Sequence, residues 1–220
     1  MSDSIEEWKK ANEYDKIREY LKNTHPDVLE SYEEWDEEQK AIKRKEEINL
    51  LKANRKYMIG FYKENYTYDE IKYEAYPSFE RTNHHGLNYV KQSMIEYIES
   101  LPIITSYRGV NSCSYTAEKY PEVNNNKKGV YYTDGEFTIS SITLLHIELY
   151  EITLPQKFVD RAERANYDPV QVIKECIWES QDEIARKLFG ARVNHENMMN
   201  NNKILAQAMS LYKKERSEQE

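Results

Sequence analysis

The sequence predicts an α+β fold that is mainly α: a helical bundle with an inserted β-hairpin and small antiparallel sheet, and a long C-terminal αα-hairpin. Three observations predict this class. Glycine and proline are scarce, at 6 each in 220 residues, and 32% of the residues are charged, a balance that favours helices with solvated faces. Apolar residues at helical spacing extend through both ends of the chain. Between these ends, residues 129–155 have the composition and turn signals of strands.

The hairpin is predicted from Asp134-Gly135, because a two-residue type I′ turn requires positive φ at both positions and this pair tolerates it. A turn there places Tyr132 opposite Phe137 and Val130 opposite Ile139 on one face of the ribbon. The alternation of side chains therefore agrees with the position of the turn, which favours a hairpin.

The N-terminal part, residues 1–80, is predicted to form an acidic helical extension. Ser4 is a suitable N-cap for a first helix, which His25-Pro26 ends, and Asp27 begins a second helix that continues to Met58. Up to Lys40 the chain contains 13 acidic and 6 basic residues, so this segment carries −7 of the net charge of −8. A long and polar helix of this kind buries little by itself and is expected to lie against another element or subunit.

Residues 81–220 are predicted to form the second domain. It begins with a helix from Leu87 to Leu101, continues through a β-hairpin region at about 103–154, and ends with helices over 156–216. The apolar run Ile142–Leu154 is interpreted as a further strand or strand pair that ends at Pro155. Gly190 suits the left-handed position after a helix, so the last two helices are expected to meet there as an αα-hairpin.

Composition and motifs exclude several classes of function. The acidic balance argues against a general nucleic-acid clamp, which needs a basic patch, and no apolar run reaches membrane-spanning length. Cys113 and Cys176 form no CxxC pair, and the N-terminus has no signal-peptide pattern, so we expect an intracellular product. No phosphate-binding glycine loop, HExxH motif or zinc quartet occurs, and the adjacent pair His84-His85 diverges, so no metal or cofactor is expected.

One set of residues resembles, in outline, the Arg, Ser-Thr-Ser and Glu-x-Glu series of ADP-ribosyltransferases. It consists of Tyr107-Arg108-Gly109, then Ser140-Ser141, then Glu148 and Glu151. The resemblance implies that Arg108 binds the dinucleotide phosphates, Ser140 positions the nicotinamide ribose and Glu148 supports transfer to host proteins. The chain departs from that pattern because its glutamates are three apart and follow the serines within one short stretch.

The C-terminal half, from about Gly129 to Glu215, resembles the tubular tail adaptor proteins of short-tailed bacteriophages. The resemblance lies in the hairpin, the apolar run ending near a proline, the corner Leu188-Phe189-Gly190-Ala191 and a final long polar helix. It implies a non-enzymatic virion protein, assembled in the host cytoplasm, that forms the head-to-tail connector as a ring of about 12 copies. Its partners would be other copies, the portal protein and other tail proteins, while DNA passes through without specific binding and no membrane is involved. The interface residues expected from this resemblance are Tyr132, Phe137, Ile139, Phe189, Gly190, Met198 and Leu205.

A third interpretation remains open: a non-enzymatic phage protein that acts by binding a host protein. The 19 tyrosines are compatible with either binding role, since tyrosine offers a large contact area with a polar tip. Particle composition and capture of a host partner would distinguish these two roles.

Overall fold

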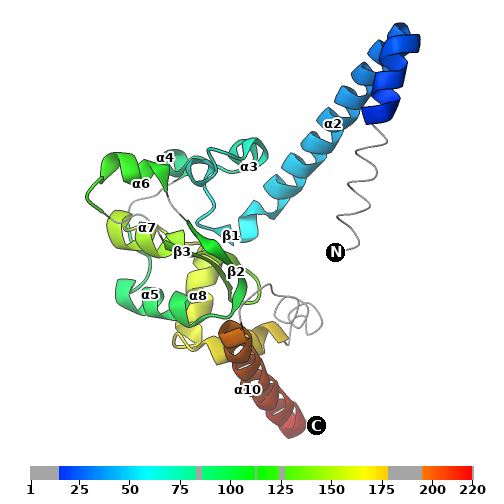
Figure 1. Cartoon of the computed structure of the whole chain (residues 1–220). Helices are drawn as coiled ribbons and strands as arrows, with labels where there is room; N and C mark the ends of the chain where they lie inside the picture. Colours follow the sequence, from blue (N-terminus) through cyan, green and yellow to red (C-terminus); the bar gives the residue numbers. More distant parts are fainter. Residues whose placement is uncertain (1–14, 83–85, 112, 124–126, 178–194, 220) are drawn as a thin grey trace. The chain divides into compact units, whose positions relative to one another are not determined.

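The computed structural model describes residues 15–82, 86–111, 113–123, 127–177 and 195–219 (Figure 1). The chain divides into two compact units, Met1–Asn49 and Leu50–Glu220. The boundary predicted from the sequence is at residue 80 instead. The difference arises because residues 58–79 contribute a strand and the buried ring of Phe79 to the second unit.

The first unit consists of two helices within its described residues. A helix at residues 15–24 ends at His25, and α2 (Pro26–Asn54) begins directly after it and continues past the boundary into the second unit. Proline fits the first turn of a helix, where its missing N–H has no partner to lose, so the predicted break at His25-Pro26 is confirmed. The guanidinium of Arg18 lies 2.8 Å from the Glu33 carboxylate and joins the two helices.

The second unit confirms the α+β, mainly α class. Its elements, in chain order, are η1 (Arg55–Tyr57), β1 (Met58–Ile59), η2 (Lys63–Asn65), α3 (Glu70–Ala75), α4 (Phe79–Thr82), α5 (Lys91–Ser100), β2 (Ile103–Asn111), α6 (Ser114–Lys119), β3 (Lys127–Thr133), β4 (Thr138–Ser140), α7 (Ile142–Tyr150), α8 (Gln156–Arg164), a helix at 169–177, and α10 (His195–Gln219).

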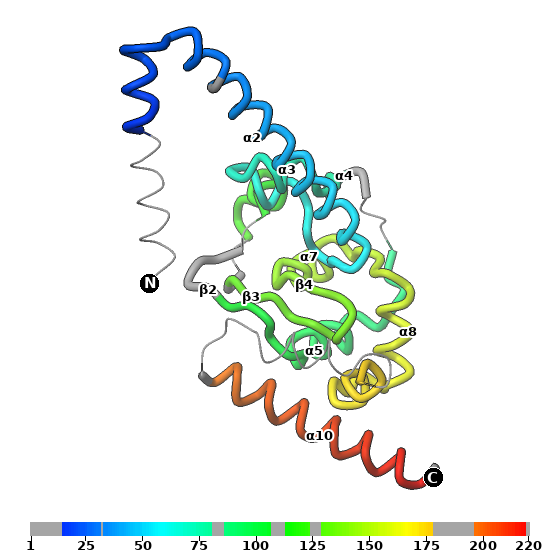
Figure 2. Tube along the Cα trace, turned by 90° about the vertical axis from the view of Figure 1, so that its right-hand side faces the viewer, coloured from blue at the N-terminus to red at the C-terminus, as the bar shows by residue number. Residues whose placement is uncertain are grey.

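The sheet of the described residues has the strand order β1-β4-β3-β2 and is mixed. Figure 2 shows β4, β3 and β2 side by side in this order. β2 pairs antiparallel with β3, and β3 antiparallel with β4, as expected. β1 was not predicted, and it pairs parallel with β4 through Met58–Thr138 and Ile59–Ile139. A parallel pair needs a long connection, which here includes α5 and two strands, and a two-residue strand is too short to show an alternating pattern in the sequence.

The hairpin is present, but its predicted register is wrong by two residues. Thr133 pairs with Thr138 and Tyr132 with Ile139, so the loop contains four residues, 134–137, and not two. An even shift keeps each side chain on its predicted face, and Val130 and Ile139 are accordingly both buried. The longer loop forms because the Asp134 carboxylate accepts hydrogen bonds from the N–H groups of Glu136 and Phe137, at 2.9 and 2.6 Å.

The strand predicted over Ile142–Leu154 is wrong, because Ile142–Tyr150 forms helix α7. All residues from Ile142 to Ile147 are buried, so the run shows neither the polar stripe of a surface helix nor the alternation of a half-buried strand. Continuous apolar runs of this length do not distinguish a buried strand from a buried helix. Glu151 ends the helix in the left-handed conformation, with φ 49°.

The main core of the second unit lies between the sheet and helices α5, α7 and α8. Its buried residues include Ile98 of α5, Ile139 of β4, Ile147 of α7, and Phe158 with Val159 of α8. The predicted positions of α5 and α8 are therefore confirmed, since their apolar stripes face this core.

A second cluster joins the helix at 169–177 to α10. Asp168 caps the first helix, because its carboxylate accepts a hydrogen bond from the Val170 N–H at 2.9 Å, as the Asp168-Pro169 pair predicts. Ile173 and Ile177 pack with Leu205 of α10 in this cluster. The predicted corner at Phe189 and Gly190 lies outside the described residues.

Gly60 is expected to tolerate alanine poorly, because its φ is +80° and an added Cβ would clash with the Thr143 Oγ1. Gly60→Ala should lower the free energy of unfolding by about 2–4 kcal/mol, from backbone strain together with overpacking. Gly86→Ala is the matched control, since Gly86 also has positive φ but nothing lies within 4 Å of its added Cβ. Equal losses in urea unfolding of the two variants would contradict the steric explanation.

Candidate functional site

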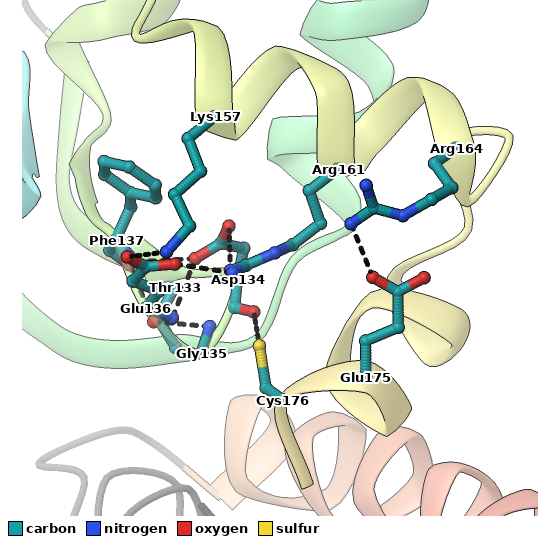
Figure 3. A network of polar contacts seen from close by, with 10 residues as sticks. All are labelled: Thr133, Asp134, Gly135, Glu136, Phe137, Lys157, Arg161, Arg164, Glu175 and Cys176. Carbon is teal, nitrogen blue, oxygen red and sulfur yellow. Dashed lines mark hydrogen bonds and ion pairs between the residues drawn. The ribbon is translucent and has the colours of Figure 1, made fainter. Parts of the chain in front are cut away.

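The hairpin loop 134–137 is the centre of a network of polar contacts that joins β3, α8 and the helix at 169–177 (Figure 3). The Thr133 hydroxyl donates to the Phe137 carbonyl at 2.7 Å and accepts from the Gly135 N–H at 2.9 Å. The loop is therefore held by two side chains: that of Asp134, within the loop, and that of Thr133, the residue before it.

Arg161 of α8 connects this loop to the helical layer. Its guanidinium lies 3.2 Å from the Asp134 carboxylate and 2.5 Å from that of Glu136. Arg161 is 3% exposed and Asp134 fully buried, so this ion pair is shielded from water. Burial raises the pKa of the Asp134 carboxyl, while the Arg161 charge and two backbone N–H groups oppose that rise. For Glu136, burial also favours the neutral form, but hydrogen bonds from Lys157 and Arg161 lower its pKa overall.

Two contacts extend the network to the C-terminal helices. The Cys176 thiol donates to the Asp134 carbonyl, with 3.2 Å between sulfur and oxygen. Arg164 lies 2.9 Å from the Glu175 carboxylate at an exposed position. These groups are engaged with one another inside the chain, so we interpret the network as a clamp that holds the hairpin loop against α8 and not as a catalytic centre.

The three residues of the ADP-ribosyltransferase resemblance lie on separate elements. Arg108 is on β2 and Ser140 on β4, and β3 lies between these two strands. Ser140 is buried at 2% exposure, whereas Glu148 is exposed on α7, a helix and not the expected strand. The structure therefore does not place the Glu148 carboxylate on the sheet as that resemblance requires.

His146 is the buried titratable group that the sequence places in an apolar run. It is fully buried among aromatic rings, with ring centroids 4.5 Å from Phe79 and 5.3 Å from Tyr62. Within the described residues neither ring nitrogen has a hydrogen-bond partner. Burial lowers the pKa of His146 to about 3, so the imidazole is neutral at physiological pH. This arrangement identifies His146 as a core residue.

A cavity of about 500 Å³ lies beside β1. Its lining is mostly apolar or backbone, from residues 58–62, Pro77 and residues 153–155, with Arg55 and Lys56 as its charged members. No carboxylate, thiol or imidazole lines it, and the polar side chains of its lining are those of Arg55, Lys56, Tyr62 and Thr153.

No group of three or more His, Cys, Asp or Glu residues among the described residues could hold a metal ion. Among the described helices, none is both long and apolar enough to cross a membrane. His84 and His85 lie outside the described ranges.

The predicted interface residues have different outcomes. Phe137, Ile139 and Leu205 are buried within the chain, at 3%, 0% and 7% exposure, so they offer little surface to a neighbouring subunit. Their apolar surface is used inside the chain, because α5, α7 and α8 cover the hairpin and the helix at 169–177 covers Leu205. Tyr132 is half-buried, and Met198 is 44% exposed on α10.

A regularly spaced apolar face on α2 lies outside the predicted interface residues, although this helix was expected to contact another element or subunit. Val28, Trp35 and Ile42 are exposed by 48%, 53% and 44%, and they are separated by seven residues each. Seven residues of an α-helix rotate about its axis by about 20° less than two full turns, so these three side chains lie on nearly the same face. We call this face the α2 seam. The seven-residue spacing is visible in the sequence, but the surrounding charge from Glu33 to Glu47 conceals it.

Comparison with known proteins yields no match: no family model, curated protein or solved structure resembles this chain significantly.

Proposed function

We propose that this protein is a structural assembly subunit that acts by binding other protein chains and has no catalytic centre. The single observation that carries the proposal is the α2 seam, an exposed apolar face on a helix of 29 residues. Large apolar side chains that recur on one exposed helix face are characteristic of surfaces that another protein covers.

The internal polar groups support the same proposal. The buried ion pair of Arg161 and Asp134 clamps the hairpin loop, His146 is enclosed in the core, and the cavity beside β1 has no acid, thiol or histidine in its lining. In the described residues, the functional groups needed for catalysis therefore do not converge on one accessible site. No observation favours the ADP-ribosyltransferase alternative.

The class of assembly follows from the resemblance to tail adaptor proteins. We propose a virion protein of the head-to-tail connector, with the portal and other tail proteins as neighbours. The order of hairpin, buried apolar segment and C-terminal helices supports this class, although the apolar segment is helix α7. Among the described residues of the predicted interface, Met198 on α10 has the largest exposed fraction, 44%.

Peptide mapping of purified particles of the virus that encodes this chain tests this proposal. We expect peptides of this chain in amounts comparable to those of the portal protein, and their persistence after a high-salt wash. A pull-down with this chain as bait from infected cells is the matched comparison, because it identifies the proteins that the chain binds outside particles. Absence from particles, together with stoichiometric capture of a host protein, would contradict the virion assignment and favour the host-binding alternative.

A further inference from the structure

The α2 seam is part of a longer helical pattern. If Val28, Trp35 and Ile42 occupy one heptad position, Asn49 is the next equivalent position, and the companion positions include Gln39 and Glu46. The stretch of α2 from residue 28 to residue 49, which contains the seam, is about 30 Å long. The apolar side chains of this face are Val28, Trp35 and Ile42, while Gln39, Glu46 and Asn49 are polar, so an apolar contact with another helix would be confined to residues 28–42.

Charge along α2 changes sign near the middle of the seam. Residues 33–38 include Glu33, Glu34, Asp36, Glu37 and Glu38, whereas residues 40–45 include Lys40, Lys43, Arg44 and Lys45. Lys40 is paired within the helix, at 2.9 Å from both Asp36 and Glu37. In contrast, Glu38, Lys43 and Lys45 make no ion pair within the part of the chain that the structure describes.

We propose that the α2 seam binds the α2 seam of a second copy of this chain, in antiparallel orientation. A two-fold axis near Lys40 brings the acidic block of one copy level with the basic block of its partner. Asp36 and Glu38 then flank the partner's Lys43 and Lys45, and the symmetry repeats these contacts on the other side. Trp35 and Ile42 lie near the axis, where each helix covers the apolar side chains of the other.

The parallel arrangement is disfavoured by the same residues. In a parallel, in-register pair, Glu46 of one helix would face Glu46 of the other at the seam, and residues 33–38 would lie level with the same acidic block. Like charges at these positions destabilise helix pairs. Opposite charges beside the seam therefore select the antiparallel pair.

This inference deepens the proposed function by naming a second copy as the partner of α2, and it rests on the proposed function only in treating α2 as a binding surface. A two-fold pair is closed, so it explains a dimer and leaves the lateral contacts of a ring to other surfaces. Dimerisation of the purified protein and presence in particles are separate measurements, so either idea can fail while the other stands.

The test is the oligomeric state of the full chain by sedimentation equilibrium. We expect a dimer with a dissociation constant in the micromolar range, and a chain that is monomeric up to about 200 µM would overturn the proposal. Asp36→Lys/Glu38→Lys and Lys43→Glu/Lys45→Glu should each weaken dimerisation at least tenfold. Mixing the two variants should restore the dimer, because each altered pair then meets the opposite charge. Failure of the mixture to associate would also overturn it.

Glu30→Lys/Glu37→Lys is the matched control, since both residues lie on the helix face opposite the seam and the change in charge is the same as in Asp36→Lys/Glu38→Lys. We expect the control to dimerise as tightly as the unchanged chain. Circular dichroism of every variant verifies that the helices remain folded, and a seam variant that loses helicity is replaced by Ile42→Gln, which keeps the charge pattern.

Orientation is measured with a spin label attached through Ser31→Cys, because both native cysteines are buried. Residue 31 lies about 10 residues from the proposed axis, so two labels should be about 30 Å apart along the antiparallel pair. A distance below about 20 Å would indicate a parallel pair and overturn the antiparallel assignment.

Discussion

Arg161→Ala is expected to lower the free energy of unfolding by about 3–5 kcal/mol, because it leaves the fully buried Asp134 carboxylate without its cation. Burial already raises the pKa of Asp134, so loss of Arg161 should make the carboxyl retain its proton at still higher pH. Urea unfolding of the variant, followed by tryptophan fluorescence, measures the change.

Arg164→Ala is the matched control on the same helix. Arg164 also pairs with a carboxylate, that of Glu175, but its side chain is 61% exposed. Exposed ion pairs contribute roughly 0–1 kcal/mol, so this variant should unfold close to the unchanged protein. Similar losses in both variants would show that the hairpin clamp has no special energetic role.

A double variant separates the ion pair from the packing of the Arg161 side chain. Arg161→Met/Asp134→Asn removes both charges while keeping comparable volumes, and it should recover part of the stability lost in Arg161→Ala. The introduced asparagine would keep an acceptor for the N–H groups of Glu136 and Phe137, which the Asp134 carboxylate now serves. No recovery would mean that the loop depends on the guanidinium itself, through its contact with Glu136.

The hairpin shows what the sequence could predict and where it could not. Asp134-Gly135 correctly located the turn, and alternation correctly assigned Val130 and Ile139 to the buried face. The loop length was missed because Asp134 serves as a buried acceptor for Glu136, Phe137 and Arg161, and the last partner lies 27 residues away. Local turn chemistry contains no information about such a distant partner.

Helix α7 shows a second limit of sequence interpretation. The segment Ile142–Tyr150 lies within the core on most of its surface, so its composition reports burial and not the type of backbone. Burial likewise occupies Phe137, Ile139 and Leu205, which were predicted to contact a neighbouring subunit: the first two pack in the main core and Leu205 packs against the helix at 169–177. The α2 seam is the opposite: its residues are exposed but were not predicted as interface residues. Their seven-residue spacing is visible in the sequence, but they are few and widely separated.

His146→Phe is expected to increase stability, and to do so more strongly in acid. The imidazole has no hydrogen-bond partner in the described residues, so it contributes the cost of two desolvated nitrogens, which the phenyl ring avoids. At pH 8 we expect a gain of about 1 kcal/mol.

The pH dependence follows from the lowered pKa of His146, about 3 in the folded protein against an ordinary value of 6.5. Between these values the unfolded chain binds a proton that the folded chain does not, so stability falls as the pH drops below 6.5. The expected loss from this residue is about 2 kcal/mol between pH 6.5 and pH 5, and His146→Phe should abolish it.

His146→Gln completes the experiment, because glutamine removes the titration but keeps a buried polar group. Its stability should be lower than that of the phenylalanine variant at every pH, and it should lack the acid-dependent loss of about 2 kcal/mol. Chemical unfolding of the three proteins at pH 8, 6.5 and 5 distinguishes the two effects. If the unchanged protein and both variants lose stability equally between pH 6.5 and 5, His146 is accessible to protons in the folded state, and the enclosed aromatic core formed with Phe79 and Tyr62 would be wrong.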